Sequence, residues 1–162
     1  MVNPASILTQ EHQAVLLKLE ALENIIRNLA QPAKVSAQLK ELSSFFDTQF
    51  WVHFDKEERA LFPEFANFMP RGAGPLAVML DEHEVIRNTW ESVHEGVAAY
   101  LKDSRDAEAV HTIEEKGSHF IGFLRSHISK EDGLFFAMAE MHLNEVQKEK
   151  VVNLFSEIEK KS

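Results

Sequence analysis

The sequence predicts an all-α protein, an up-down-up-down four-helix bundle followed by an additional C-terminal helix. Apolar residues recur at intervals of three and four along four long segments, as they do on one face of a helix. Three breaks containing proline, glycine or runs of polar residues separate these segments, at 30–33, 69–75 and 102–106. No alternation of apolar and polar residues persists, so the sequence offers no candidate strand.

The first and third segments each have one continuous apolar face that includes a histidine. The first face consists of Leu8, His12, Val15, Leu19, Leu22, Ile26 and Leu29. The third consists of Met79, His83, Ile86, Trp90, Val93, Val97 and Tyr100. Residues at this spacing lie above one another on a helix, so both histidines are expected to point into the bundle.

The second and fourth segments add a glutamate four residues after their histidine. The second face consists of Leu39, Leu42, Phe46, Phe50, His53, Glu57 and Leu61, with a local drift of one residue. The fourth consists of Ile113, Gly117, Phe120, Leu124, His127, Glu131 and Leu134. The two segments resemble each other, which suggests two helical hairpins related by a pseudo-two-fold axis.

A fifth amphipathic helix is expected at about 143–160, after a kink near Gly133. Its apolar side includes Val146, Val151, Leu154, Phe155 and Ile158. Two roles are open for this helix: it caps the bundle, or it mediates a homodimer.

The length of 162 residues fits a single domain over 1–162, with the bundle core at about 5–136. The absence of cysteine removes disulfides, thiolate metal sites and a cysteine nucleophile. A net charge of −9 with scattered lysines argues against nucleic acid and anionic membranes as partners. With no stretch resembling a signal peptide or a membrane span, we expect a cytoplasmic protein.

Together the four faces supply a set of side chains that are typical metal ligands. The set is His12, His53, Glu57, His83, His127 and Glu131. Residues equidistant from a turn lie level in an antiparallel hairpin, and the midpoints between ligands on successive helices fall in the three breaks. Since each residue rises about 1.5 Å, small errors in the turns move a side chain by only a few ångströms. The six side chains are therefore expected to converge.

Two carboxylates that face each other in an apolar core are costly unless cations neutralise them. Two divalent ions would do so, with the histidines binding as neutral imidazoles. One ion would take His12 and His53, the other would take the two histidines of the second hairpin, and both glutamates would bridge. Nitrogen-rich mixed ligands suit iron, zinc, copper or manganese better than calcium or magnesium. An open dinuclear site of this kind suits iron and dioxygen chemistry.

Four motifs in order give the chain a resemblance to the hemerythrin-like, or HHE cation-binding, domain family over about 5–136. They are Glu11-His12, His53-Phe-Asp-Lys-Glu-Glu-Arg-Ala-Leu-Phe-Pro63, Asp81-Glu-His83-Glu84 and His127-Ile-Ser-Lys-Glu131. The resemblance implies a non-haem site with two iron ions, for which zinc or manganese could substitute. It also implies that the site binds dioxygen or a related small ligand such as nitric oxide or peroxide.

One departure from the family's pattern bears on function. Oxygen-carrying hemerythrins have a His-x-x-x-His pair on the third helix, whereas the residues four positions from His83 are Met79 and Arg87. An exogenous ligand or water would take the place of the missing histidine. Binding or sensing of a small ligand is the first hypothesis. The alternatives are a di-iron oxidoreductase acting on peroxide or nitric oxide, an iron donor for Fe–S repair, and a storage or structural bundle, so enzyme activity stays open.

Three polar residues next to the predicted ligands also carry expectations. Gln49 lies one turn before His53 and is a candidate hydrogen-bond partner for its ring, a role that ligand histidines usually fill. Glu58 and Asp132 follow the two glutamates and are expected to be solvated charges.

Overall fold

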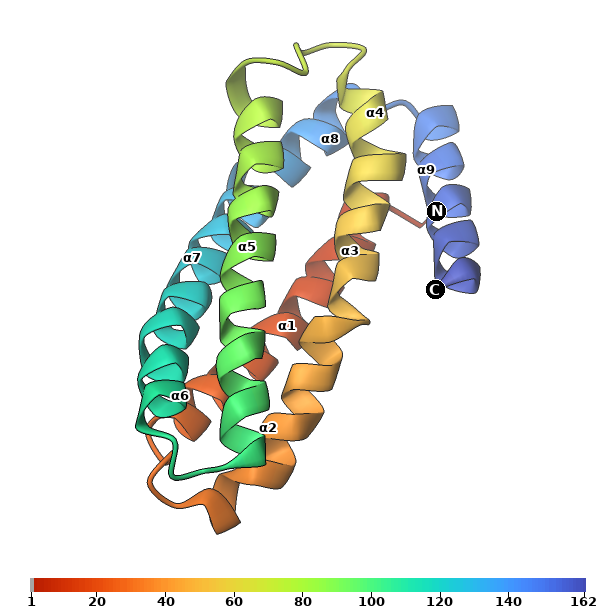
Figure 1. Cartoon of the computed structure of the whole chain (residues 1–162). Helices are drawn as coiled ribbons and strands as arrows, with labels where there is room; N and C mark the ends of the chain where they lie inside the picture. The colour runs from red at the N-terminus through yellow and green to blue at the C-terminus, as the bar shows by residue number, and fades with distance from the viewer. Residues whose placement is uncertain (1) are drawn as a thin grey trace.

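A computed structural model describes residues 2–162 as four antiparallel helical columns with a fifth helix packed beside them (Figure 1). No strand occurs among these residues, so the predicted all-α class is confirmed. The first column is α1 (Pro4–Ile26) and the third is α5 (Gly74–Lys102). The second column comprises α2 (Pro32–Asp47), α3 (Phe50–Lys56), η1 (Glu57–Leu61) and α4 (Phe62–Phe65). The fourth comprises α6 (Ala107–Thr112), η2 (Ile113–Gly117), α7 (Ser118–Lys130), η3 (Glu131–Phe135) and α8 (Phe136–His142), and α9 (Glu145–Lys161) follows.

The ends of the helices follow from local chemistry. Asn3 caps α1 by accepting a hydrogen bond from the Ala5 N–H, and Pro4 occupies the first turn, where it loses no helical bond. Asn144 and Gln147 form a reciprocal capping box at the start of α9. Gly74, at the start of α5, has a φ of 72°, which side chains with a Cβ rarely adopt.

The drift in the second apolar face corresponds to a break in the column between α2 and α3. Thr48 leaves the helical region with φ −130° and ψ −77°, and its hydroxyl donates to the Ser44 carbonyl. The chain resumes as α3, which returns Phe50 and His53 to the buried face. The break therefore changes which residues face the core just before the predicted ligands.

Among residues 2–162, two of the three π-helical segments begin at the predicted bridging residues, Glu57 and Glu131. A π-turn places one extra residue in the helix and is frequent at functional sites. In η3 this extra residue moves the buried position from Leu134, which is 60% exposed, to Phe135, which is 2% exposed. The expectation that Leu134 continues the apolar face is therefore wrong.

The apolar core consists of two clusters, called upper and lower from the places of their helices in Figure 1, and the predicted ligands lie between them. In α1, His12 follows Leu8 of the upper cluster and precedes Val15 of the lower cluster. In α5, His83 lies between Met79 of the upper cluster and Ile86 of the lower one. A polar layer thus crosses an otherwise apolar interior near one end of the bundle.

The C-terminal helix packs on the first hairpin, against α3, η1 and α1 (Figure 1). Val151, Phe155 and Ile158 are buried in this contact, whereas Val146, expected on the same side, is 76% exposed. Val146 lies in the first turn of α9, beyond the buried stripe of this helix. None of the helices in residues 2–162 has the length and apolar character needed to cross a bilayer.

Candidate metal centre

The structure brings the six predicted ligands into one buried cluster. Their donor atoms form two overlapping groups of four, and within each group these atoms lie within 4.8 Å of one another. The first group is His12, His53, Glu57 and Glu131, and the second is Glu57, His83, His127 and Glu131. Both groups share the two glutamates, which is the arrangement that two neighbouring ions with common carboxylates require.

The spacing of donor atoms in the first group suits a single ion. His12 Nε2 lies 3.0 Å from His53 Nε2, and His53 Nε2 lies 3.0 Å from Glu57 Oε1. Bonds of about 2.1 Å at right angles place two ligand atoms about 3 Å apart. Two donor pairs of the first group therefore have the spacing that a transition-metal ion requires, while His12 Nε2 lies farther from Glu57 Oε1 and Glu131 Oε1, at 4.0 and 3.7 Å.

Glu57 reaches both groups with its two oxygens. Oε1 lies 3.0 Å from His53 Nε2, and Oε2 lies 3.1 Å from His83 Nε2. Glu131 contributes similarly, with Oε1 2.5 Å from His127 Nε2 and 3.7 Å from His12 Nε2. Each glutamate therefore lies between the two histidine pairs.

A second ring of four carboxylates fixes the orientation of the imidazoles. Each histidine has its Nδ1 against one carboxylate oxygen. The pairs are His53 with Glu11 at 2.9 Å, His12 with Asp132 at 2.8 Å, His83 with Glu58 at 2.6 Å and His127 with Glu82 at 2.9 Å. A proton held on Nδ1 by a carboxylate leaves the lone pair of Nε2 free for a metal.

These contacts correct three expectations. The partner of His53 is Glu11, from the neighbouring helix, and not Gln49. Glu58 and Asp132 are hydrogen-bonded to cluster histidines, so they are not merely solvated charges. The sequence contains a signal for all four carboxylates, because Glu11 and Glu82 precede equivalent histidines, while Glu58 and Asp132 follow equivalent glutamates.

Neighbouring cations stabilise three members of the second ring, Glu11, Glu58 and Glu82, as carboxylates. Burial raises the pKa of Glu11, but hydrogen bonds from His53 and Lys56 bring it below its usual value. The pKa values of Glu58 and Glu82 are also lowered, because hydrogen bonds from a cluster histidine and from Arg87 or Lys130 outweigh burial. Ionised partners of this kind make the histidines better ligands.

In the part of the chain that the structure describes, the two inner carboxylates, Glu57 and Glu131, lack the hydrogen-bond partners that the four carboxylates of the second ring have. Six buried atoms have no hydrogen-bond partner among residues 2–162, namely both oxygens of Glu57 and of Glu131, His83 Nε2 and His127 Nε2. Burial, with the facing charge of Glu131, raises the pKa of Glu57 well above its usual value. Burial alone would raise the pKa of Glu131 too, but contacts with Glu57 and His127 lower it. Unpaired buried carboxylates are costly, and bound cations would satisfy these atoms.

Aromatic rings enclose the cluster. Phe54 stacks on His83 with ring centroids 3.7 Å apart and an interplanar angle of 6°. Phe62 stacks on the same histidine at 5.6 Å, and Phe136 stacks on His12 at 5.4 Å. These contacts exclude water and hold the imidazoles in place.

Met79 and Arg87 of α5, the residues four positions from His83, differ in their surroundings. Met79 is 4% exposed and belongs to the upper apolar cluster, so it places an uncharged side chain one turn from His83. Arg87 is partly exposed, and its Nη2 donates to Glu58 Oε2 at 2.7 Å. The same oxygen accepts from His83 Nδ1 at 2.6 Å. Arg87 thus acts on His83 through Glu58.

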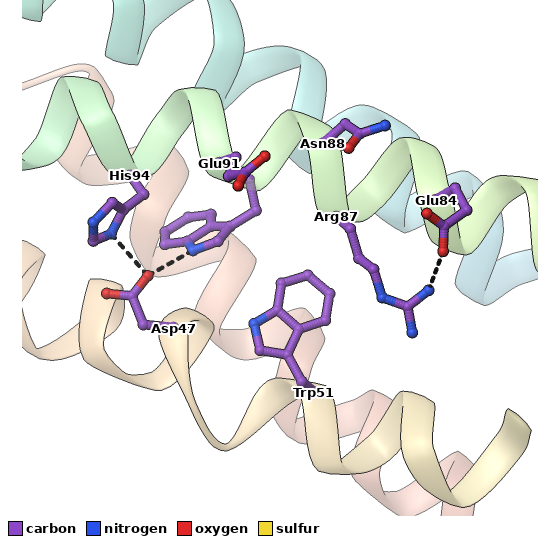
Figure 2. Close-up of a pocket in the computed structure, with 8 residues that line it drawn as sticks. Asp47, Trp51, Glu84, Arg87, Asn88, Glu91 and His94 are labelled. Carbon is purple, nitrogen blue, oxygen red and sulfur yellow. Dashed lines mark hydrogen bonds and ion pairs between the residues drawn. The ribbon is translucent and has the colours of Figure 1, made fainter. Parts of the chain in front are cut away.

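Arg87 also lines an open groove of about 690 Å³ between the second column and α5 (Figure 2). In this groove Asp47 Oδ1 accepts hydrogen bonds from Trp90 Nε1 at 2.8 Å and from His94 Nδ1 at 2.9 Å. These bonds tie α2 to α5 below the cluster. His94 therefore has a structural partner far along the helix from the predicted ligands.

A small inner pocket adjoins the cluster on the side of the lower core. Part of its wall is formed by His12, His53, His127 and Glu131. The remaining wall is apolar, formed by Val15, Phe50, Phe54, Leu124 and Ile128. These side chains approach one another so closely that no water molecule fits between them. The pocket thus meets ligands of both groups.

The fold and the cluster together define a helical bundle with a buried candidate site for two cations. The chain matches the Hemerythrin HHE cation binding domain over residues 3–139, and it belongs to that family. No curated protein matches the sequence significantly.

Proposed function

We propose that the protein is a non-haem di-iron protein that binds dioxygen or a related small ligand, nitric oxide or peroxide, at a carboxylate-bridged dinuclear centre. The observation that supports this most directly is the position of Glu57, whose two oxygens face the two histidine pairs at 3.0 and 3.1 Å. The ligands are proposed to be His12, His53, Glu57, His83, His127 and Glu131.

The donor set supports iron as the metal. Imidazole nitrogen with carboxylate oxygen suits iron, with zinc or manganese as substitutes. Bound iron would supply reversible coordination and redox chemistry. Each group offers four protein donors, fewer than the roughly six that an octahedral ion accepts. The remaining positions would be free for an exogenous ligand.

The role of the chain is to hold charge and to keep the site dry. Glu11, Glu58, Glu82 and Asp132 fix the protons on the Nδ1 atoms, so all four Nε2 atoms face inward. The stacked rings of Phe54 and Phe136 restrict rotation of the imidazoles. Such preorganisation favours metal binding, because the imidazoles are already held in position before an ion binds.

The inner pocket favours ligand binding over turnover of peroxide or nitric oxide. Apart from the candidate ligands, the side chains that line it within the described part of the chain are apolar. None of them can donate a proton to a reacting oxygen, which general acid catalysis would require. An oxidoreductase is therefore the second candidate, and a storage or structural bundle is the third.

Stopped-flow absorbance separates the three candidates. The protein is loaded anaerobically with ferrous iron and mixed in turn with dioxygen, nitric oxide and peroxide. A long-lived coloured adduct that disappears on removal of the gas is expected. Sustained consumption of peroxide or nitric oxide would favour the oxidoreductase, and air oxidation without any adduct would favour the storage or structural bundle.

A further inference from the structure

A second pocket lies on the surface beside the cluster, between α1, α3 and α9. It encloses about 310 Å³, and His53 forms part of its floor. His53 is 6% exposed, whereas the other five members of the cluster are at most 1% exposed. The cluster therefore comes nearest to solvent at His53, inside this pocket.

The outer and inner pockets share a wall. Val15, Phe50 and His53 line both of them. The layer between the surface pocket and the cluster is thus one side chain thick. Rotation of Phe50, or a small shift between α1 and α3, would connect the two spaces.

The C-terminal helix builds this pocket on one hairpin. Glu159 of α9 and Glu11 of α1 both accept hydrogen bonds from Lys56, at 2.5 and 2.6 Å. The Lys56 side chain is only 4% exposed in this contact. Lys130, its counterpart in the second hairpin, pairs with Glu82 and has a side chain that is 51% exposed. Because α9 covers Lys56 and no helix within residues 2–162 covers Lys130 in the same way, the two hairpins differ on the side where the pocket lies.

The chemistry of the pocket selects among small molecules. Val15, Phe45 and Phe50 give it an apolar wall. The two carboxylates at its rim outnumber the one ammonium group between them, so an anion would be repelled. A small uncharged molecule meets no such barrier, and apolar cavities bind apolar gases.

We propose that this pocket is the access chamber through which a small uncharged diatomic molecule reaches the cluster, with Val15 and Phe50 as its gate. The proposal rests on the proposed function, because it assigns the route for the ligand of that site. It adds a role for α9, which forms one wall of the chamber.

Xenon tests the chamber independently of iron. Methyl resonances of the full-length chain are recorded under xenon pressure, with and without metal. Xenon is expected to shift the Val15 and Val52 methyls, since both residues line the chamber. The Ala14→Trp variant should abolish the shift, because Ala14 lines the chamber from an exposed position of α1, where a large side chain fits without disturbing the core. The matched control is Val85→Trp, at the equivalent position two residues after His83, which should leave the shift unchanged.

The route itself is tested by the rate of nitric oxide association with iron-loaded protein. Ala14→Trp should slow association about tenfold, equivalent to a barrier about 1.4 kcal/mol higher, while Val85→Trp leaves it unchanged. Xenon shifts absent from the wild-type chain, or equal association rates in the two variants, would overturn the chamber alone. Failure of the wild-type chain to take up iron would overturn the proposed function, and the route with it.

Discussion

Glu57 Oε2 lies 3.1 Å from His83 Nε2, although the two residues belong to different helical hairpins. The other oxygen of Glu57 faces His53 of its own hairpin at 3.0 Å. A carboxylate in this position joins the two halves of the cluster. The histidines on both sides explain the proposed bridging role of Glu57, and its burial explains the cost of leaving it without a cation.

The carboxylates of the second ring should control metal affinity. Asp132→Asn removes the charge that holds the proton on His12 Nδ1 while keeping the size of the side chain. Loss of such a partner typically lowers metal affinity about 10- to 100-fold. Competition with a chelator measures the change. Asp81→Asn is the control, because it makes the same change at an exposed position; an equal loss in both variants would refute a specific role for Asp132.

The histidines of the cluster should matter for metal content far more than histidines elsewhere. His53→Ala is expected to remove most of the metal that the first group holds. His119→Ala changes an exposed histidine of α7 and should leave the content unchanged. Metal analysis of the two purified variants decides the point, and similar losses in both would show that His53 is not a ligand.

The stability of the metal-free protein should fall as pH rises. The pKa of Glu57 is raised by burial and by Glu131. That of His83 is also raised, because contacts with Glu57 and Glu58 outweigh burial. Groups with raised folded-state pKa values bind protons more tightly than in the unfolded chain. The stability they contribute is present below their unfolded-state pKa values and is lost as pH rises through the folded-state values.

Thermal unfolding at pH values of about 5.5 and 7.5 tests this sign. The metal-free protein should melt at a lower temperature at the higher pH. Glu131, whose pKa is lowered, loses its contribution only below its usual value of 4.5 and lies outside the window. Metal should restore stability at the higher pH, because it binds the folded state. Glu57→Gln should flatten the dependence in the metal-free protein; an unchanged slope would exclude Glu57 as a main source.

The π-turn after the cluster can be tested through two adjacent residues. Phe135→Ala removes a ring that is 2% exposed and stacks on Phe65 at 4.1 Å, so it should cost about 3–5 kcal/mol in the free energy of unfolding. Leu134→Ala changes a side chain that is 60% exposed and should cost no more than about 0.5 kcal/mol. Denaturant titration compares them. A larger cost at Leu134 would mean that the helix runs through without the extra residue.

The bundle and the convergence of the six side chains could be predicted because both follow from helical spacing. A histidine and a glutamate four residues apart share a face, and turns at the three breaks set their level. The repeat between the halves also carried a signal for the second ring. That signal is ambiguous, because a charged residue beside a ligand can be solvated as well as hydrogen-bonded.

Other features depend on packing that the spacing does not encode. The π-turns at Glu57 and Glu131 insert a residue without a distinctive sequence, so the burial of Phe135 in place of Leu134 could not be seen. The position of α9 depends on long-range packing of Val151, Phe155 and Ile158 against the first hairpin. The pocket beside His53 likewise depends on how α9 packs on the first hairpin, because Glu159 of α9 lines it.

Anaerobic titration of metal-free protein with ferrous iron tests the central claim most directly. Two overlapping groups that share Glu57 and Glu131 predict a break at about two iron ions per chain. Glu57→Ala should weaken both sites together, since its oxygens face both histidine pairs. Saturation at one iron ion per chain in the wild-type protein, or loss of a single site in Glu57→Ala, would contradict a carboxylate-bridged dinuclear centre.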